Sequence, residues 1–366
     1  MTPAAASVRR TDGAAAQCRI KVLIVDDSVV ARAVLSRMVA ADPLLDIVGE
    51  ASGAHDALAI LRRTRVDVIL LDVEMPGTSG LQALPAILKE GRGARVLVVS
   101  SVAEDGAAAT VEALRLGAAD TLPKPGGGRM TGTFSSQLLA KVRALGQARP
   151  LVVTPSPSVS RPRPVRRAGL EPLACVAIGS STGGLHALAA LFATLPARIG
   201  VPILVTQHLP AVFMPFFARH LALVSKRDVV VATPGAPLRA DLVMVAPGDA
   251  HLQLARGAGG PVISLSREPS AAGCLPSVDP MLSAAAQAFG GAALGVVLTG
   301  MGRDGVEGAR SLVRVGGTVL VQDAASSTVW GMPRAVAEAG LASGVLDPAE
   351  IARWIAERAP KPALVG

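Results

Sequence analysis

Short hydrophobic runs alternate with longer segments of mixed polarity through the first 125 residues of the chain. Runs that are apolar at consecutive positions predict strands buried on both faces, and the intervening segments have the spacing of apolar residues that helices show. Five strands joined by helices predict a doubly wound, five-stranded parallel sheet. The runs lie at 22–25, 47–49, 66–71, 96–99 and 118–122.

The same alternation resumes in the second half and predicts a second α/β domain with a mainly parallel sheet. Between residues 241 and 267 the pattern changes, because three apolar runs are separated only by short turns rich in glycine. Runs joined in this way favour a small antiparallel insertion, to which we assign 242–245, 251–254 and 262–265. The apolar runs of the main sheet are 175–178, 203–206, 229–232, 296–298 and 318–321.

A stretch rich in proline, serine and arginine separates the two halves and shows no hydrophobic periodicity. Such composition favours a semi-extended linker. The first residues of the chain hold no continuous apolar segment, so we interpret them as a disordered leader rather than a secretion signal. The predicted organisation is a leader at 1–18, a first domain at 19–146, a linker at 147–172 and a second domain at 173–360.

Composition narrows the class of protein. Half of the 366 residues are hydrophobic and 17% are charged, which suits two buried cores and excludes wholesale disorder. The apolar stretch at 281–302 is broken by polar residues and glycines, so no membrane insertion is expected.

Cys18, Cys175 and Cys274 lie far apart without metal-binding spacing, and we expect them to be small buried side chains. These features favour a cytoplasmic protein.

The net charge of +8 would ordinarily suggest nucleic-acid binding. However, nine basic residues and no acidic residue lie between 121 and 170, which accounts for the whole excess. The chain also holds only six Phe, two Trp and no Tyr, so aromatic surfaces for stacking bases are scarce. We therefore expect no nucleic-acid partner.

Polar residues follow the predicted strands of the first domain, where ligands gather in parallel sheets. Asp26 and Asp27 end the first strand, Asp72 the third, Ser100 the fourth and Lys124 the fifth. Carboxylates at one edge repel each other unless a hard cation such as Mg²⁺ lies among them. One carboxylate could then accept a phosphoryl group, with the lysine and serine binding its oxygens. The alternative is that Asp26 or Asp27 only caps the following helix.

The second domain places a serine, a histidine and an aspartate after three of its predicted strands. Ser181 lies in a glycine-rich turn between a strand and a helix, and such a turn can bind phosphate or present a nucleophile. The nucleotide-binding motifs are absent. His208 and Asp304 follow two other strands, so they could serve as base and orienting acid. Taken singly, each has a plain alternative: Ser181 and Asp304 as helix caps, His208 as a turn residue.

The first domain resembles the receiver domain of bacterial two-component response regulators through KVLIVDDS, LLDVEMPGTSG, VLVVSS and TLPKP. The resemblance implies a flavodoxin-like fold and phosphorylation at Asp72. It also implies Mg²⁺ binding by Asp26, Asp27 and Asp72, with switching through Ser100 and Lys124.

One position departs from the receiver pattern. Many receivers carry an aromatic switch residue three positions before the lysine, and this chain has Thr121 there. Coupling by rotation of a buried ring is therefore not expected.

The second domain resembles the catalytic domain of CheB, the chemotaxis protein-glutamate methylesterases, through IGSSTGG, TQHLP, VMVAPGDAHL, LPSVD, GVVLTGMGRDG and GMPRAV. The resemblance implies that Ser181 is the nucleophile, His208 the base and Asp304 the orienting acid. Thr182 and Met301 fall where the family has oxyanion-hole backbone and local support. The implied activity is hydrolysis of glutamate γ-methyl esters with release of methanol, together with glutamine deamidation, and neither needs a cofactor.

The resemblance also implies partners and a mode of control. Methyl-accepting chemoreceptors would be the substrates, and a chemotaxis histidine kinase would be the phosphodonor. The first domain would cover the active site until Asp72 is phosphorylated. Two other functions stay open from the residues alone: a serine hydrolase with a different substrate, and a regulator whose second domain binds DNA or a partner without catalysis.

Overall fold

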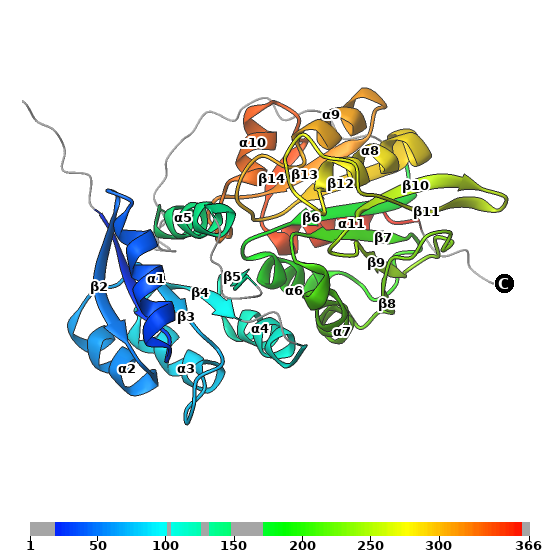
Figure 1. The fold of residues 1–366 in the computed structure, drawn as a ribbon. Helices are drawn as coiled ribbons and strands as arrows, with labels where there is room; N and C mark the ends of the chain where they lie inside the picture. The colour runs from blue at the N-terminus through cyan, green and yellow to red at the C-terminus, as the bar shows by residue number, and fades with distance from the viewer. Residues whose placement is uncertain (1–18, 101–103, 126–131, 148–170, 361–366) are drawn as a thin grey trace, which may run out of the picture.

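Two α/β domains form the protein, and the main sheet of each domain is parallel (Figure 1). The structure is a computed structural model that describes residues 19–100, 104–125, 132–147 and 171–360. The predicted leader, Cys18 and linker residues 148–170 lie outside the described residues.

The N-terminal domain contains a five-stranded parallel sheet in the order β2-β1-β3-β4-β5. The chain changes direction across the sheet between β1 and β3, so the carboxyl ends of these two strands border the crevice where ligands bind in such folds. The strands are β1 (Ile20–Val25), β2 (Leu45–Ala51), β3 (Val68–Leu71), β4 (Arg95–Ser100) and β5 (Asp120–Pro123).

Helices cover both faces of this sheet because alternate residues of each strand point to opposite sides. Val22 and Ile24 of β1 belong to one hydrophobic cluster, with residues of α1 and α5. Leu23 and Val25 belong to another, with residues of α2, α3 and α4. The helices are α1 (Val29–Ala40), α2 (Ala54–Arg63), α3 (Gly80–Glu90), α4 (Glu104–Leu116) and α5 (Gly132–Gln147).

The C-terminal domain contains a seven-stranded sheet in the order β14-β13-β12-β6-β7-β9-β8, and every pairing in it is parallel. Strand β6 lies at the centre, with β7 on one side and β12 on the other. The strands are β6 (Cys175–Ser180), β7 (Ile203–Gln207), β8 (Val229–Val231), β9 (Val243–Val245), β12 (Ala293–Val297), β13 (Thr318–Gln322) and β14 (Gly344–Leu346).

The helices of this domain also form two layers. Residues of α6, α7 and α11 pack together on one side of the sheet, and residues of α8, α9 and α10 pack on the other. The helices are α6 (Gly184–Thr194), α7 (Met214–Ser225), α8 (Val278–Phe289), α9 (Val306–Arg314), α10 (Met332–Glu338) and α11 (Pro348–Arg358), with the short 3-10 turns η2 (Ala211–Phe213) and η3 (Gly290–Ala292).

The antiparallel insertion is smaller than the sequence predicts. Among the strands of the described residues, the antiparallel pair is β10 (His251–Gly257) with β11 (Gly260–Ser266). The run at 242–245 was predicted to belong to this insertion, but it forms β9 of the main sheet and pairs in parallel with β7 and β8. The prediction was wrong because an all-apolar run of four residues fits either kind of strand, and burial on both faces decides the outcome.

The two domains pack directly against each other. Helix α4 of the N-terminal domain contacts α6, α7 and η2, and one continuous hydrophobic cluster includes residues of all four. Figure 1 shows α4, β5 and α5 on the side of the N-terminal domain that faces the C-terminal domain. This arrangement brings β5 and α5 close to the carboxyl ends of β6 and β7.

Two further expectations concern hydrophobic segments and cysteines. Among the described residues, no helix has the length and apolar character needed to cross a membrane. Cys175 is fully buried in β6, as expected. Cys274 was also expected to be buried, but it is only partly so, because it lies in a loop that borders a cavity.

The core of the C-terminal domain provides a test of stability. Phe217 of α7 is completely buried, so Phe217→Ala should lower the free energy of unfolding of this domain by about 3–5 kcal/mol. Leu223 lies on the same helix and is 79% exposed, so Leu223→Ala should change it by less than about 0.5 kcal/mol. Urea unfolding followed by circular dichroism measures both. Equal losses would contradict the packing described for α7.

Candidate active site

Ser181 lies in a rigid turn between the central strand β6 and helix α6. The Gly184 N–H donates a hydrogen bond to the Ser181 carbonyl oxygen at 2.8 Å, which closes the turn. Gly183 has a φ of 78°, and a Cβ atom there would lie 2.3 Å from the Thr328 hydroxyl oxygen. Any larger residue would therefore displace the turn.

The backbone on either side of Ser181 is also fixed by a buried side chain. Gln207, the last residue of β7, donates from its amide nitrogen to the Ser181 carbonyl oxygen at 2.9 Å. Its amide oxygen accepts a hydrogen bond from the Ser180 hydroxyl at 2.6 Å. These contacts link the ends of β6 and β7, so they fix the position of Ser181 relative to His208.

His208 and Asp304 meet after β7 and β12. The His208 Nε2 atom lies 2.8 Å from the Asp304 Oδ2 atom, and the carboxylate is only 1% exposed. The other ring nitrogen of His208 makes no hydrogen bond with any described residue and can therefore face the cavity. A carboxylate on one ring nitrogen fixes the tautomer and orientation of an imidazole, which prepares the other nitrogen to accept a proton.

Asp304 is held by several donors at the start of α8. Its carboxylate accepts hydrogen bonds from the Ser277 hydroxyl at 2.7 Å and from the backbone N–H groups of Val278 at 2.7 Å, Asp279 at 3.1 Å and Gly305 at 2.9 Å. Burial alone would raise its pKa, but the hydrogen bonds from His208 and these donors lower the pKa to about 2. The group is therefore a stable anion at neutral pH.

The helix caps in the structure differ from the caps that Ser181 and Asp304 were expected to form under the alternative interpretation. The N-cap of α6 is Gly183, and Ser181 makes no side-chain cap there. Helix α9 begins after Gly305 without a side-chain cap. Asp304 does accept hydrogen bonds from a helix N-terminus, but the helix is α8 rather than the following α9.

Ser181 and His208 open into a shared cavity of about 620 Å³ between the two domains. No hydrogen bond joins these two side chains in the described part of the chain. One wall comes from β5 and α5 of the N-terminal domain, and the other comes from loops of the C-terminal domain. The lining residues include Thr121, Gln137 and Lys141 on the first wall and Pro210, Asp249, Cys274 and Met301 on the second.

Cys274 is a second candidate nucleophile in the cavity. Its thiol, a His208 ring nitrogen and an Asp304 carboxylate oxygen all lie within 4.8 Å of one another. Burial, together with the charges of Asp304 and Asp279, raises the pKa of Cys274 to about 11. The thiol is therefore protonated at neutral pH, which leaves Ser181 as the better candidate nucleophile.

Thr182 and Met301 place backbone N–H groups near Ser181. Neither N–H donates a hydrogen bond to another described residue. The loop that carries Met301 approaches closely, because a Cβ atom added to Gly300 would lie 2.7 Å from the Ser181 Cβ atom. Free N–H groups on two sides of a serine are the arrangement that an oxyanion hole requires.

The N-terminal domain contacts the turn that carries Ser181. The carboxylate of Asp120, at the start of β5, accepts hydrogen bonds from the Thr182 hydroxyl and from the Lys141 ammonium group of α5. The Gly183 N–H donates to the Ala119 carbonyl oxygen at 2.9 Å. We call these contacts the interdomain clasp.

The carboxylates predicted to bind a cation lie together at the carboxyl ends of β1 and β3. Oxygen atoms of Asp26, Asp27 and Asp72 lie within 4.8 Å of one another. The Lys124 ammonium group donates to Asp26 at 2.8 Å and to Asp72 at 2.6 Å. Three carboxylates at this spacing suit the all-oxygen coordination of Mg²⁺.

Burial raises the pKa of Asp72 above its usual value, even though hydrogen bonds from Lys124 and the Glu74 N–H lower it. Burial alone would lower the pKa of Lys124, but its hydrogen bonds to Asp26 and Asp72 raise it. Lys124 therefore stays a cation and offsets part of the repulsion between the carboxylates. The helix-capping alternative does not hold for these aspartates, since the N-cap of α1 is Ser28.

Ser100 is turned toward α4 rather than toward Asp72. Its hydroxyl lies 2.6 Å from the Thr110 hydroxyl, which itself donates to the Gly106 carbonyl oxygen at 2.7 Å. Because Thr110 uses its only hydroxyl hydrogen in that bond, Ser100 is the donor. Thr121, at the position of the aromatic switch, is 3% exposed and borders the cavity between the domains.

Several residues of these sites had no signal in the sequence reading. Ser277 lies within the LPSVD motif, but nothing in the letters connects it to Asp304. Gln207 follows the predicted strand at 203–206, and its place in the sequence does not indicate contacts with Ser180 and Ser181. Asp120 and Thr110 face partners from other elements, so only the tertiary structure reveals their role.

Comparisons with known proteins agree with this architecture. The model of the CheB methylesterase family matches residues 176–355, and the model of the response regulator receiver domain matches residues 22–130. A protein-glutamate methylesterase/protein-glutamine glutaminase of Paramagnetospirillum magneticum is 39% identical, and the match covers 93% of this chain and 97% of that protein. The chain belongs to the CheB methylesterase family.

A second member of the family, protein-glutamate methylesterase/protein-glutamine glutaminase 2 of Caulobacter vibrioides, is 44% identical over 93% of this chain and 99% of its own. The solved CheB catalytic domain of Thermotoga maritima is 36% identical, covers 50% of this chain and 98% of its own, and gives a TM-score of 0.49. The CheB part of this chain contains Ser181, His208 and Asp304, and its receiver part contains Asp26, Asp72 and Lys124.

The donors around Asp304 lead to a prediction on stability. Asp304→Asn replaces one acceptor oxygen by a donor, so we expect the free energy of unfolding at pH 7 to fall by about 1–3 kcal/mol. The folded pKa of about 2 is below the ordinary 3.8, so this stabilisation is present above about pH 4 and is lost as the pH falls toward 2. The difference between wild type and variant should therefore shrink at low pH.

Urea unfolding at pH 7 and at pH 3 measures this difference. Asp249→Asn is the matched control, because Asp249 is exposed and pairs with the exposed Arg267 at 2.6 Å. We expect less than about 0.5 kcal/mol for the control. An Asp304→Asn variant as stable as the control at pH 7 would contradict the role given to the donors of α8.

Proposed function

We propose that this chain is a phosphorylation-activated protein-glutamate methylesterase and protein-glutamine glutaminase that acts on methyl-accepting chemoreceptors. The observation that carries the proposal is the His208–Asp304 hydrogen bond of 2.8 Å at the cavity that Ser181 also lines. Relatives similar over most of their length are named for the same two activities. The proposal includes domains at 19–146 and 173–360, joined by a linker at 147–172.

The first half of the reaction forms an acyl-enzyme. His208 accepts the proton of the Ser181 hydroxyl, and the Ser181 oxygen attacks the γ-carbonyl carbon of a methylated glutamate. The tetrahedral intermediate carries its negative charge on the former carbonyl oxygen. The free N–H groups of Thr182 and Met301 are placed to stabilise that charge, and one such donor is worth about 10²–10³ in rate. His208 then protonates the leaving methoxide, which departs as methanol.

The second half releases the product. His208 accepts a proton from water, the resulting hydroxide attacks the acyl carbon, and Ser181 leaves with the proton returned by His208. The product is a glutamate carboxylate. A glutamine amide passes through the same steps with ammonia as the leaving group, so one site serves both activities. Asp304 stays ionised throughout and stabilises the imidazolium form of His208.

Phosphorylation controls access to this site. The Asp72 carboxylate attacks the phosphoryl group of a donor, which in the cell is the chemotaxis histidine kinase. Mg²⁺ held by Asp26, Asp27 and Asp72 would neutralise the charge that gathers on the phosphoryl oxygens. Lys124 and the Ser100 hydroxyl bind those oxygens, so Ser100 leaves Thr110 of α4.

Helix α4 transmits this change to the interface because it packs against α6, α7 and η2. A shift of α4 weakens the contact between the domains, and the closed form then opens in a larger fraction of molecules. Moving such an equilibrium from 1:99 to 99:1 needs about 5.5 kcal/mol, so phosphorylation increases the open fraction without making it complete. We place the protein in the cytoplasm, where receptor methylation sites and kinase are accessible.

Loss of the nucleophile tests the catalytic assignment. Ser181→Ala should reduce methanol release from a methylated receptor fragment by about 10³-fold or more, because the variant lacks the hydroxyl group that forms the acyl intermediate. Phosphorylation at Asp72 should persist, which shows that the protein is folded. Ser180→Ala removes only the hydrogen bond to Gln207 and should keep the rate within about tenfold. An active Ser181→Ala variant would refute the assignment.

The interdomain clasp gives a prediction on control. Asp120→Ala removes the acceptor of Thr182 and Lys141, so the closed form should lose about 1–2 kcal/mol. The activity without phosphodonor should rise about 5- to 30-fold, and the stimulation by phosphodonor should fall. The measurement is methanol release with and without a small phosphodonor.

Two variants serve as controls for this experiment. Asp46→Ala changes an exposed aspartate of β2 in the same domain and should leave both rates unchanged. Asp72→Asn should keep the rate without phosphodonor and lose the stimulation. If Asp120→Ala left the unstimulated rate at the wild-type value, the clasp would not hold the closed form.

A further inference from the structure

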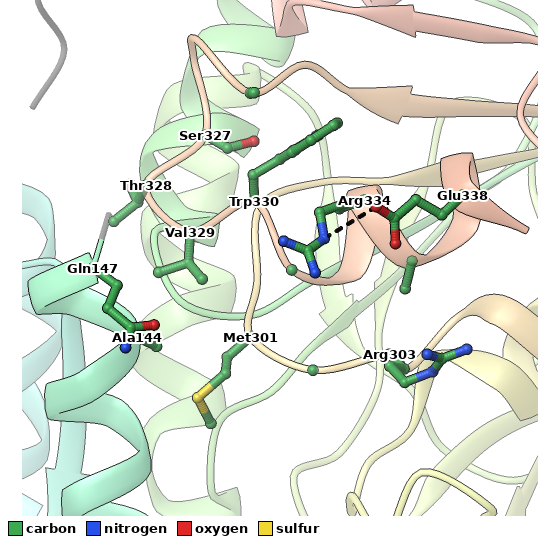
Figure 2. A pocket seen from close by; sticks show the side chains of 14 residues that line it. Ala144, Gln147, Met301, Arg303, Ser327, Thr328, Val329, Trp330, Arg334 and Glu338 are labelled. Carbon is green, nitrogen blue, oxygen red and sulfur yellow. Dashed lines mark ion pairs between the residues drawn. The ribbon is translucent and has the colours of Figure 1, made fainter. Parts of the chain in front are cut away.

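A second cavity, of about 700 Å³, lies beside the catalytic cavity on the other side of the loop that carries Met301. Figure 2 shows Trp330 and Arg334 of the C-terminal domain along it, with Arg303 at its edge and Gln147 of α5 on the opposite side. None of the catalytic groups Ser181, His208 and Asp304 lines this cavity. The proposed reaction therefore leaves it without a role.

The two cavities are neighbours, because Met301 lines both of them. The loop between them is fixed on the side of the second cavity, where the Gly300 N–H donates to the Val329 carbonyl oxygen at 3.0 Å and the Met332 N–H donates to the Gly300 carbonyl oxygen at 2.8 Å. The same Gly300 approaches Ser181 closely on the other side. A ligand in the second cavity would therefore lie within one short loop of the reacting serine.

The charged groups of this cavity favour an anionic ligand. Arg303 is exposed, and its side chain makes no hydrogen bond or ion pair with a described residue. Arg334 pairs with Glu338 one turn further along α10 at 3.5 Å, and both side chains are more than half exposed. Such an exposed pair contributes little energy and can be replaced by another carboxylate. Two guanidinium groups are thus available, and each can bind a carboxylate in bidentate fashion.

Trp330 adds a rigid apolar surface. Its indole N–H donates to the Gln322 carbonyl oxygen at 2.9 Å, which fixes the orientation of the ring. Figure 2 shows the ring standing along the cavity between Ser327 and Arg334. Tryptophan and arginine are the residue types that contribute most to binding energy at protein interfaces.

We propose that this cavity is a docking site for acidic side chains of the substrate protein, next to the glutamate that carries the methyl ester. The inference rests on the proposed function and extends it to substrate recognition. A helix rises 5.4 Å per turn, so a helical substrate with its ester at Ser181 brings side chains one or two turns away across Met301 to Arg303 and Arg334. Trp330 packs against the apolar part of that helix.

The position of α5 makes this docking site dependent on the state of the receiver. Ala144 and Gln147 of α5 form part of its wall in the closed form (Figure 2). A substrate helix that lies across Met301 would need the space that α5 occupies. Opening of the domains therefore exposes the docking site and the catalytic cavity together.

The test compares two substrates in the full chain with phosphodonor present. One is a methylated receptor fragment, and the other is p-nitrophenyl acetate, which has no acidic side chains. Arg303→Gln and Arg334→Gln should each raise the KM for the receptor fragment about threefold to tenfold, with little change in kcat. The ratio of kcat/KM for the receptor to that for the small ester should fall by the same factor. Added salt should reduce the effect.

Glu338→Gln should change the KM for the receptor fragment in the opposite direction, and this result decides between the two roles of Arg334. It removes the carboxylate that competes for Arg334, so the KM for the receptor fragment should fall below the wild-type value. If Arg334 served only the stability of α10, Glu338→Gln and Arg334→Gln would break the same pair and act alike. Arg256→Gln, on the exposed part of the β10 strand, is the matched control and should leave the substrate ratio unchanged.

The outcomes separate this inference from the proposed function. If Ser181→Ala abolishes methanol release but the arginine variants keep the wild-type KM for the receptor fragment, the docking site is refuted and the esterase proposal stands. If the arginine variants lower the rates with both substrates equally, the arginines act on the catalytic cavity and the docking site is again refuted. Methanol release that persists in Ser181→Ala refutes the proposed function itself.

Discussion

One buried anion organises the C-terminal site. The Asp304 carboxylate binds His208 with one oxygen and gathers the first N–H groups of α8 and the Ser277 hydroxyl around both oxygens. A buried charge without partners would be strongly destabilising, so these donors are a condition for placing an aspartate there at all. The orientation of the His208 imidazole therefore depends on the packing of α8 against the sheet.

Much of this organisation could be read from the sequence. Apolar runs marked ten of the twelve strands that the described residues form in the two parallel sheets, because a strand buried on both faces leaves little room for polar residues. The carboxyl ends of those runs then indicated where Asp26, Asp72, Ser181, His208 and Asp304 would gather. The short strands β9 and β14 could not be assigned correctly from the sequence, since three or four apolar residues show no periodicity that distinguishes one kind of strand pairing from another.

Contacts between distant elements could not be read in this way. The pairing of Asp120 with Thr182 joins positions 62 residues apart in different domains. The donors to Asp304 come from a helix that begins 26 residues before it. The hydroxyl of Ser100 is directed by Thr110, although the motif alone suggested Asp72 as its neighbour. Such partners depend on the angle at which helices and domains pack, which local patterns do not encode.

The turn that presents Ser181 is also the place where the receiver attaches, through the Thr182 hydroxyl and the Gly183 N–H. The three residues 181–183 therefore carry both the proposed nucleophile and the contacts with the receiver domain. A substitution that improved the chemistry would alter the grip of the regulatory domain, and one that tuned the grip would disturb the chemistry. Catalytic rate and inhibition by the receiver are therefore coupled at this turn. The contact can be changed independently of the reaction only from the β5 side, where Ala119 and Asp120 take no part in the proposed chemistry.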